Sequence, residues 1–371
     1  MTEEKLKKVG IVELRLAKGP VPHYKEIVKL SGAIMAFLVN EFGTKEVIKR
    51  FSDPLWTNCY ACVVGFEWQF SGLTTVPLMA TKEALEKENL GIKVIGGKGK
   101  KARALDEISS VCGSLGLSDQ KIEEIKRASK LTCKVDTCEV QDSHSLYFHA
   151  MLVDEKGNYA TINQKMNVKK GTARRFHWII NPKQFAEEPY IAAIGTRKDI
   201  VVNLTSKASR ECRKVIVDNV KDMTPKKLYQ TIISLSREVG QTTITQFLGM
   251  KVVKLPYYLQ IPKRISLEAL EIAHEIAPKN FENLLEIKNI GPATIRGLAY
   301  VSKLIYDTDF SFEDPVKYTF AFGTKAKIPY PVEKKAMREV ADILQNAIEQ
   351  AKLGERDKIN AIKRLKDFIK I

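Results

Sequence analysis

Hydrophobic positions follow helical spacing in two segments of the N-terminal half. In residues 23–51, Ile27, Leu30 and Ile34 lie on one stripe, which predicts an amphipathic helix. Pro54 ends this helix, because proline cannot continue the backbone hydrogen bonding. A second helix is predicted over residues 117–131, with Ser118 as its N-cap.

The pattern changes to alternation in the middle of the chain. Residues 133–140, 146–153 and 159–166 alternate like strands, and the sequence DEKG at 154–157 is typical of a turn. These segments predict an antiparallel β-meander with one hairpin. From residue 206 onward the pattern is almost entirely helical, with prolines between the helices.

The order of these elements predicts an α+β protein. We expect an N-terminal α/β domain with the antiparallel β-meander over residues 1–205. A mainly helical domain should follow over residues 206–371, with a helix-hairpin-helix at residues 280–305.

Charge adds a class of partner to this picture. The chain has 371 residues, and 60 Lys and Arg against 44 Asp and Glu give a formal net charge of +16. Such a field attracts polyanions, of which nucleic acid is the commonest inside a cell. The alternative is a lysine-rich surface that is merely solvated.

The termini and cysteines indicate a cytoplasmic location and no membrane partner. The first nine residues lack the hydrophobic region of a signal peptide, and the most apolar stretch, residues 33–39, is too short to span a bilayer. The six cysteines include a single CxxC, Cys59 and Cys62, which lies among apolar residues. We therefore expect reduced core cysteines, with a metal or redox pair as the alternative.

The most specific motif is LLEIKNIGPATIRGLAYVSKLI at residues 284–305. Pro292 suits the first position of a helix, and Asn289 tolerates a left-handed backbone in the turn before it. Gly291 would let backbone approach a phosphate, and the N–H groups of Ala293 and Thr294 would point at that anion. The alternative is an ordinary helical hairpin.

This segment resembles the helix-hairpin-helix of DNA-repair proteins. The resemblance implies a grip on the DNA backbone, with Arg296 among the contacts, and a monovalent cation held by the carbonyls of Leu285, Ile287 and Ile290. The sequence departs from the pattern at Asn289, where glycine is usual.

Two basic segments could contact the same polyanion. The glycine-rich loop GGKGKKAR carries Lys98, Lys100, Lys101 and Arg103, although its spacing is not that of a P-loop. The segment KKGTARRFHW at residues 169–178 contains Arg174 and Arg175 next to aromatic residues. We expect these cations to neutralise phosphates. A solvated loop and a core segment are the alternatives.

Polar residues on the predicted meander suggest catalysis. The predicted catalytic residues are Asp136, Gln141, Asp142, His149 and Gln164. Carboxylates rarely occur in strands without a role, and a pair of them suits Mg²⁺ or Mn²⁺. Asp136 and Asp142 would bind the metal, His149 would act as general base or orient water, and the glutamines would position phosphate or water. Asx turns and buried hydrogen-bonded groups are the alternatives.

Several segments together resemble one family. They are DPLWTNCYACVVGFEWQFSGLTTV, GGKGK, KVDTCEVQD, SLYFHAML, ARRFHW, LLEIKNIGPATIRGLA and DPVKYTFAFGTK. They are similar to the prokaryotic domain-of-unknown-function family 763 over nearly the whole chain. The resemblance places the predicted catalytic residues, together with Arg174, Arg175 and His177, in family motifs, and it implies no activity.

Three functions fit these observations. The first is a metal-dependent nuclease of DNA repair that acts on double-stranded or structured DNA. The second is a helix-hairpin-helix DNA glycosylase, which would use one of the carboxylates downstream of the hairpin, Asp307, Asp309 or Asp314, although Ala293 stands where bifunctional enzymes often have lysine. The third is a non-enzymatic module that binds DNA structure.

Overall fold

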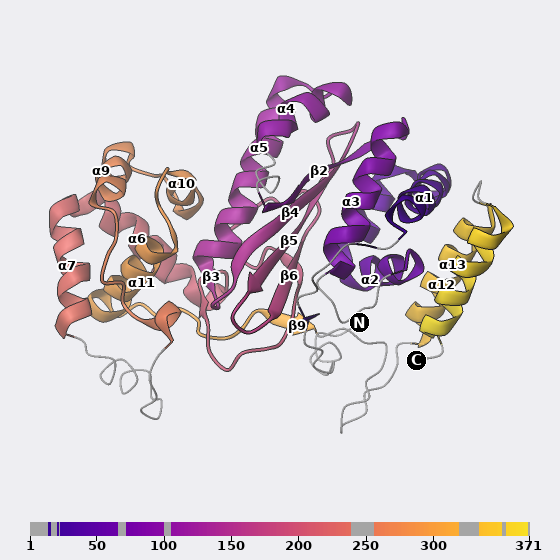
Figure 1. The fold of residues 1–371 in the computed structure, drawn as a ribbon. Coiled ribbons are helices and arrows are strands. Elements are labelled where there is room, and N and C mark those ends of the chain that lie inside the picture. The colour runs from indigo at the N-terminus through magenta and orange to yellow at the C-terminus, as the bar shows by residue number, and fades with distance from the viewer. Residues whose placement is uncertain are drawn as a thin grey trace.

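An antiparallel sheet runs through the middle of the molecule, with helices on both faces (Figure 1). The computed structural model describes residues 14–15, 21, 23–65, 72–99, 105–238, 256–318, 334–350 and 354–369. The main sheet comprises β1 (Leu14–Arg15), β2 (Ile92–Lys98), β4 (Ser145–Asp154), β5 (Tyr159–Asn167), β6 (Thr172–Trp178), β7 (Tyr190–Ile194) and β9 (Val316–Tyr318). The fold is therefore α+β, as the sequence predicts.

The strand order is β2-β4-β5-β6-β7-β9, with β1 paired to one end of β6. All pairs are antiparallel except β7 with β9. Asp154 and Gly157 form the turn between β4 and β5, where the Gly157 N–H donates to the Asp154 carbonyl and Gly157 has a φ of 74°. The predicted meander and its hairpin turn are confirmed.

One face of the sheet is covered by α1 (Tyr24–Ser52), α2 (Pro54–Val63) and α3 (Gly72–Lys87). Asp53 separates the first two helices as an N-cap, because its carboxylate accepts from the Leu55 N–H at 2.7 Å and Pro54 takes the first helical position. Both cysteines of the CxxC are buried in α2, and all six cysteines of the chain are free, as expected.

The helix α1 has 29 residues and is long and apolar enough, by length and composition, to cross a membrane. Its backbone leaves the helical region at Gly43, and its residues Ile34, Met35 and Leu38 are fully buried in the cluster that covers the sheet. Packing on the sheet therefore accounts for the apolar stripe of this helix.

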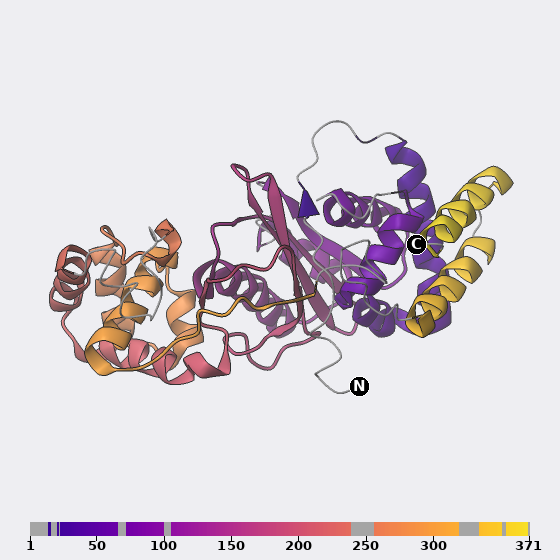
Figure 2. The same cartoon turned by 90° about the horizontal axis from the view of Figure 1, so that it is seen from below.

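The last two helices, α12 (Lys334–Gln350) and α13 (Glu355–Ile369), pack on α1 and α2. They lie at the opposite end of the molecule from the other C-terminal helices (Figure 2). Leu344 and Ile348 are buried in the same apolar cluster as α1. These two helices, predicted as part of the helical C-terminal domain, therefore share a core with the N-terminal helices.

The other face of the sheet is covered by α4 (Leu105–Ser114) and α5 (Asp119–Lys134), and α5 continues into the π-helix η3 (Val135–Glu139). Ser118 caps α5 as predicted. A short strand β3 (Val140–Gln141) follows and pairs with β8 (Val202–Asn203). The prediction of a strand at residues 133–140 is therefore wrong. Leu131, Val135 and Cys138 are buried at spacings of four and three, which is the helical period.

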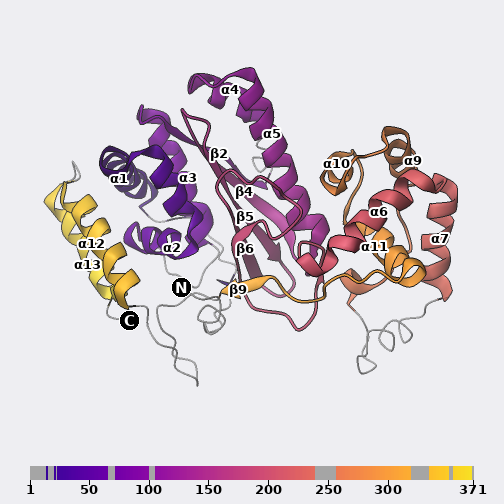
Figure 3. The ribbon, with the colours of Figure 1, turned by 180° about the vertical axis from the view of Figure 1, so that it is seen from behind.

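A group of short helices adjoins α5 (Figure 3). It comprises η4 (Lys207–Ser209), α6 (Arg210–Asp222), α7 (Pro225–Glu238), η5 (Tyr257–Leu259), α9 (Leu267–Ile276), α10 (Phe281–Glu286) and α11 (Pro292–Tyr306). One apolar cluster runs from Met151 on the sheet through Ile125 of α5 to Leu298 of α11. The helices thus share a core with the sheet, and a boundary at residue 205 stays a prediction.

Candidate functional site

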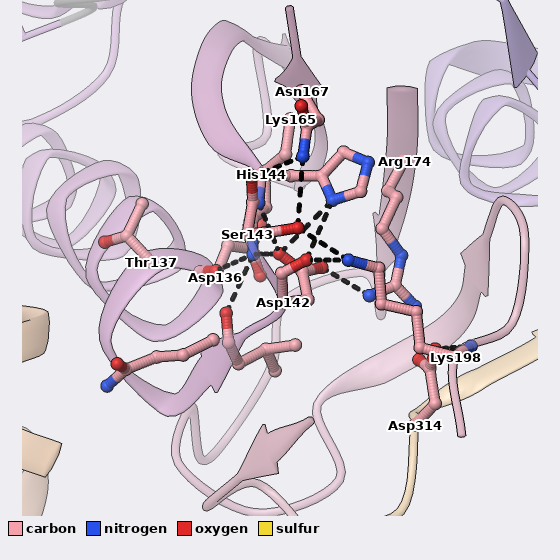
Figure 4. Close-up of polar contacts among 12 residues, drawn as sticks. Asp136, Thr137, Asp142, Ser143, His144, Lys165, Asn167, Arg174, Lys198 and Asp314 are labelled. Carbon is pink, nitrogen blue, oxygen red and sulfur yellow. Dashed lines mark hydrogen bonds and ion pairs between the residues drawn. The ribbon is translucent and has the colours of Figure 1, made fainter. Parts of the chain in front are cut away.

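Asp142 is the centre of a buried cluster of charges on the α5 side of the sheet (Figure 4). Its Oδ1 accepts from Lys165 Nζ at 2.9 Å, and its Oδ2 accepts from Arg174. Arg174 also donates to Asp314, so two cations and two carboxylates alternate. Burial alone would raise the pKa of Asp142, but the charges of Lys165 and Arg174 hold it well below its usual value.

Asp136 belongs to a buried chain of hydrogen bonds that ends at Ser129. Asn163 Nδ2 donates to Asp136 Oδ2 at 2.6 Å, and Asn163 Oδ1 lies 2.6 Å from His149 Nδ1. The other nitrogen of His149, Nε2, lies 2.9 Å from Ser129 Oγ. Because Asn163 Oδ1 can only accept, Nδ1 of His149 carries the proton and the ring accepts from Ser129.

Burial shifts the pKa values of Asp136 and His149 in the directions that favour their uncharged forms. It raises the pKa of Asp136 to about 6, against hydrogen bonds from Tyr190, Asn163 and Trp178 that lower it. Burial also lowers the pKa of His149 to about 4. Asp136 and His149 were predicted to share a site, and the structure does bring them together, through Asn163.

The donor set around Asp136 and Asp142 does not fit a hard divalent cation. Each oxygen of these two carboxylates already accepts from a protein donor, and both residues are buried. A cation at Asp142 would have to displace Lys165 and Arg174, whose charges would then repel it. Within the described residues, no group of three or more His, Cys, Asp or Glu side chains is placed to hold a metal.

Gln164 and Arg175 lie on the opposite face of the sheet from Asp136. Alternate residues of a strand point to opposite faces, and Asn163 and Lys165 contact Asp136, so Gln164 points away. Gln164 donates to the Tyr147 hydroxyl. Arg175 donates to Thr74 at 2.9 Å and to Asn58 at 2.6 Å, and burial lowers its pKa to about 9. Neither residue can join the cluster at Asp142.

His177, which the family resemblance highlighted, lies two residues after Arg175 and is also buried. Burial, followed by the charge of Arg175, lowers the pKa of His177. Arg174 and Arg175, predicted to neutralise phosphates, are each about 1% exposed. The two arginines therefore stabilise the interior on either side of the sheet.

The turn between α10 and α11 has the backbone geometry that the sequence predicts. Asn289 adopts a left-handed conformation with φ of 65°, and Gly291 is extended with φ of -125°. Pro292 is the first residue of α11, and no side chain caps this helix. Lys288, Asn289 and Pro292 are exposed, so the N-terminal end of α11 faces solvent.

Three side chains fix this hairpin to the rest of the molecule. Gln141 Nε2 donates to the carbonyl of Pro292 at 2.8 Å, and Gln141 Oε1 accepts from Arg296. Lys134, near the end of α5, donates to the carbonyl of Ile290. Gln141 and Arg296, predicted as catalytic and DNA-binding residues, thus hydrogen-bond to each other and join β3 to α11, and their predicted roles stay predictions.

The carbonyl of Ile290 was one of three predicted to hold a monovalent cation. In the structure it accepts from the ammonium of Lys134, and the Ile287 carbonyl accepts the Ile290 N–H at 3.4 Å. A positive charge thus already lies at the hairpin, supplied by the protein. The metal ion itself stays a prediction.

A basic cavity of about 370 Å³ opens beside Arg174, and the sequence reasoning missed most of it. Its charged lining comes from Lys170, Arg174, Arg197, Lys198 and Asp199. Lys198 Nζ donates to the carbonyl of Asp142 and, at 2.6 Å, to Ser143 Oγ. The lysines at 169 and 170 were visible as a basic pair, but no pattern links residue 198 to them, because β7 and its loop bring it there.

The remaining predicted residues are distributed as follows. Lys98 ends β2 and is exposed, whereas Lys100, Lys101 and Arg103 lie outside the described residues. Thr294 is buried and Ala293 is half-buried at the start of α11. Of the three carboxylates considered for glycosylase chemistry, Asp309 pairs with Lys303 and Asp314 with Arg174, and Asp307 is the left-handed C-cap of α11.

Comparison with known families decides the affiliation. Residues 10–332 match the family described as protein of unknown function (DUF763). The chain belongs to the DUF763 family. This match confirms the resemblance seen in the motifs. The matched range includes the hairpin between α10 and α11 and the residues that line the basic cavity of this DUF763 protein. No curated protein and no solved structure matches the chain.

Proposed function

We propose that this DUF763 protein binds the sugar-phosphate backbone of duplex DNA through a helix-hairpin-helix formed by α10 and α11. The observation that carries the proposal is the exposed N-terminal end of α11, preceded by an extended Gly291 and a left-handed Asn289. The first N–H groups of a helix have no partner within it, and the helix dipole favours an anion beside them. A DNA phosphate is the anion that suits a chain of charge +16.

Gly291 supports the proposal in a second way. A Cβ built at this position meets nothing within 4 Å, and its backbone is one that any residue can adopt. Folding therefore does not require glycine here. A residue without a side chain at the mouth of a helix terminus instead leaves room for a ligand to approach the backbone.

The rigid attachment of the hairpin also favours a binding role. Gln141, Lys134 and Arg296 hold the turn against the end of α5 and β3. A loop held in one conformation loses little entropy when it binds. The glutamine and lysine reach the turn from more than 150 positions away in the sequence, so the hairpin is oriented by the whole fold.

The proposal does not extend to metal-dependent cleavage. The carboxylate oxygens of Asp136 and Asp142 accept hydrogen bonds from protein donors, and His149 is buried between Asn163 and Ser129. Nuclease and glycosylase activity stay predictions. Incubating the protein with duplex, flap and deaminated substrates, with and without Mn²⁺, measures both.

The test of the hairpin compares Gly291→Val with Gly113→Val. Gly113 lies in α4, and a Cβ there also meets nothing within 4 Å, so both variants should fold. In fluorescence anisotropy with a labelled duplex, Gly291→Val should bind at least about ten-fold more weakly, because its side chain blocks the phosphate. Gly113→Val should bind like the wild type. Equal duplex affinities of the two variants would refute the proposal that the hairpin is the DNA-binding site.

A further inference from the structure

The basic cavity beside Lys198 has an excess of positive charge that the residues described by the structure do not neutralise. Arg174 is balanced by Asp142 and Asp314. Lys170, Arg197 and Lys198 remain, and Asp199 is the only carboxylate among the described lining residues. The ammonium of Lys198 makes its hydrogen bonds to a carbonyl and a hydroxyl, which do not cancel its charge.

Two buried donors that belong to residues lining the cavity have no acceptor within the described structure. They are Nε of Arg174, a residue about 1% exposed, and the hydroxyl of Thr196. Buried polar groups in folded proteins are nearly always hydrogen-bonded, and an exception needs an explanation. The uncompensated cations that line the cavity indicate a ligand that is rich in hydrogen-bond acceptors and negative charge.

The size of the cavity indicates more than a lone ion. A volume of about 370 Å³ lies within the usual range of ligand pockets, roughly 300–1,000 Å³. Tyr258 forms part of the wall, and its ring lies 5.1 Å from Lys198 Nζ. An anion attached to a sugar or base would use the charges and the aromatic ring together.

We propose that this cavity is a binding site for a phosphate monoester, with Lys170, Arg197 and Lys198 as the charges that hold the phosphate. The monoester can come from a free nucleotide or from the phosphorylated end of a nucleic-acid strand. The second source rests on the proposed function. The cavity and the hairpin are joined by consecutive residues, since Gln141 contacts Pro292 and Asp142 contacts Arg174 and, through its carbonyl, Lys198.

The first experiment measures calorimetric binding of inorganic phosphate and of adenosine monophosphate at constant ionic strength. Lys170→Gln and Arg197→Gln change exposed residues, so the fold should survive. Each should weaken binding about ten-fold, because one charge-assisted hydrogen bond is lost. Lys169→Gln is the matched control, since Lys169 is the exposed neighbour of Lys170 and does not line the cavity.

Binding that the control weakens as much as the two test variants would overturn the proposal. So would the absence of binding by both phosphate and the nucleotide. Loss in Lys170→Gln and Arg197→Gln alone supports it.

The second experiment separates the two sources of the phosphate. Duplexes with and without a 5′-phosphate are compared for the wild type, Arg197→Gln and Gly291→Val. A preference for the phosphorylated end that disappears in Arg197→Gln assigns the site to strand ends. Tight binding of the nucleotide without any end preference assigns it to free nucleotides, and both results support a phosphate site.

The same variants keep the two proposals distinguishable. If Gly291→Val retains full duplex affinity while Arg197→Gln still loses nucleotide binding, the hairpin proposal fails and the phosphate site stands. If only Gly291→Val loses affinity and no variant alters phosphate binding, the phosphate site fails.

Discussion

Gln141 donates its side-chain amide to the carbonyl of Pro292, and so joins the end of β3 to the first residue of α11. The same amide group donates to the Cys138 carbonyl at 2.8 Å, while its oxygen accepts from Arg296. The side chain is about 5% exposed. One uncharged side chain, together with Lys134 and Arg296, therefore fixes the hairpin relative to β3 and the end of α5.

We expect Gln141→Leu to destabilise the protein by about 2–3 kcal/mol, because the guanidinium of Arg296 and the Pro292 carbonyl lose buried partners. Urea unfolding measures this change. Gln120→Leu, an exposed change in the first turn of α5, should alter the free energy of unfolding by less than about 0.5 kcal/mol. Similar changes in the two variants would show that the hydrogen bonds of Gln141 to Pro292 and Arg296 do not contribute to the free energy of unfolding.

The ammonium of Lys134 at the Ile290 carbonyl should make hairpin binding insensitive to the type of monovalent cation. The wild type should bind duplex equally in potassium chloride and in tetramethylammonium chloride at one ionic strength. Lys134→Met leaves the Ile290 carbonyl open to a metal ion, so this variant should bind duplex more tightly in potassium chloride than in tetramethylammonium chloride. The neighbouring Lys130→Met should behave like the wild type, and a potassium preference in the wild type would contradict the expectation.

The buried chain from Asp136 to His149 should give two opposing dependences of stability on pH. A carboxyl with its pKa raised to about 6 contributes stability at low pH, which is lost as the pH rises through about 6. An imidazole with its pKa lowered to about 4 contributes stability above about 6.5, which is lost as the pH falls toward about 4. Each shift of roughly two units corresponds to about 3 kcal/mol.

Asp136→Asn removes the pH dependence that comes from the carboxyl, so the pH dependence of stability in this variant should be that of His149 alone. Between about pH 6.5 and pH 4, the free energy of unfolding of this variant should fall by up to about 3 kcal/mol more than that of the wild type. Chemical unfolding at a series of pH values measures the difference. Asp119→Asn changes an exposed carboxylate of α5 and should keep the wild-type profile. Parallel profiles for Asp136→Asn and wild type would disprove the coupling.

Anion binding in the basic cavity should weaken as the pH rises through about 8. Burial, together with Arg174 and Lys170, lowers the pKa of Lys198 to about 8, against the opposite effect of Asp142 and Asp314. The protonated form attracts the anion, so its loss removes affinity. Sulfate is the suitable probe, because its own charge does not change in this range. A Lys198→Met variant should show a flat profile, and a flat profile in the wild type would contradict the assignment.

Local patterns in the sequence were enough to predict the meander, its turn and the left-handed Asn289. Each of these features depends on residues that are neighbours in the chain. Gly157 determines the turn after β4, and Pro292 marks the start of α11 next to Asn289. The strand predicted at residues 133–140 was wrong because polar Asp136 and Glu139 are buried, which hid the helical spacing of Val135 and Cys138.

The site was harder to predict, because its parts meet only in the folded molecule. Arg174 was predicted to contact phosphate, and no local pattern in the sequence shows that Asp142 and Asp314 pair with it. Gln164 looked like a partner of Asp136, yet it differs from Asn163 by one position and so faces the other side of the sheet. Alternation along β5 separates Asn163 from Gln164, but it shows which of them faces Asp136 only once the helical segment that carries Asp136 has been placed correctly.

Adjacent arginines on β6 have a consequence for how the strands choose their register. Both faces of this sheet are covered by helices, so a strand whose side chains were all apolar could shift its register by one residue and still bury them. In a sheet with one exposed face, the same shift would move the apolar side chains into solvent. Such a slip would take Arg174 away from Asp142 and leave Lys165 and Arg175 facing groups of the wrong kind. The buried charged side chains therefore specify a single register between β5 and β6, because only that register places each of them beside its partner.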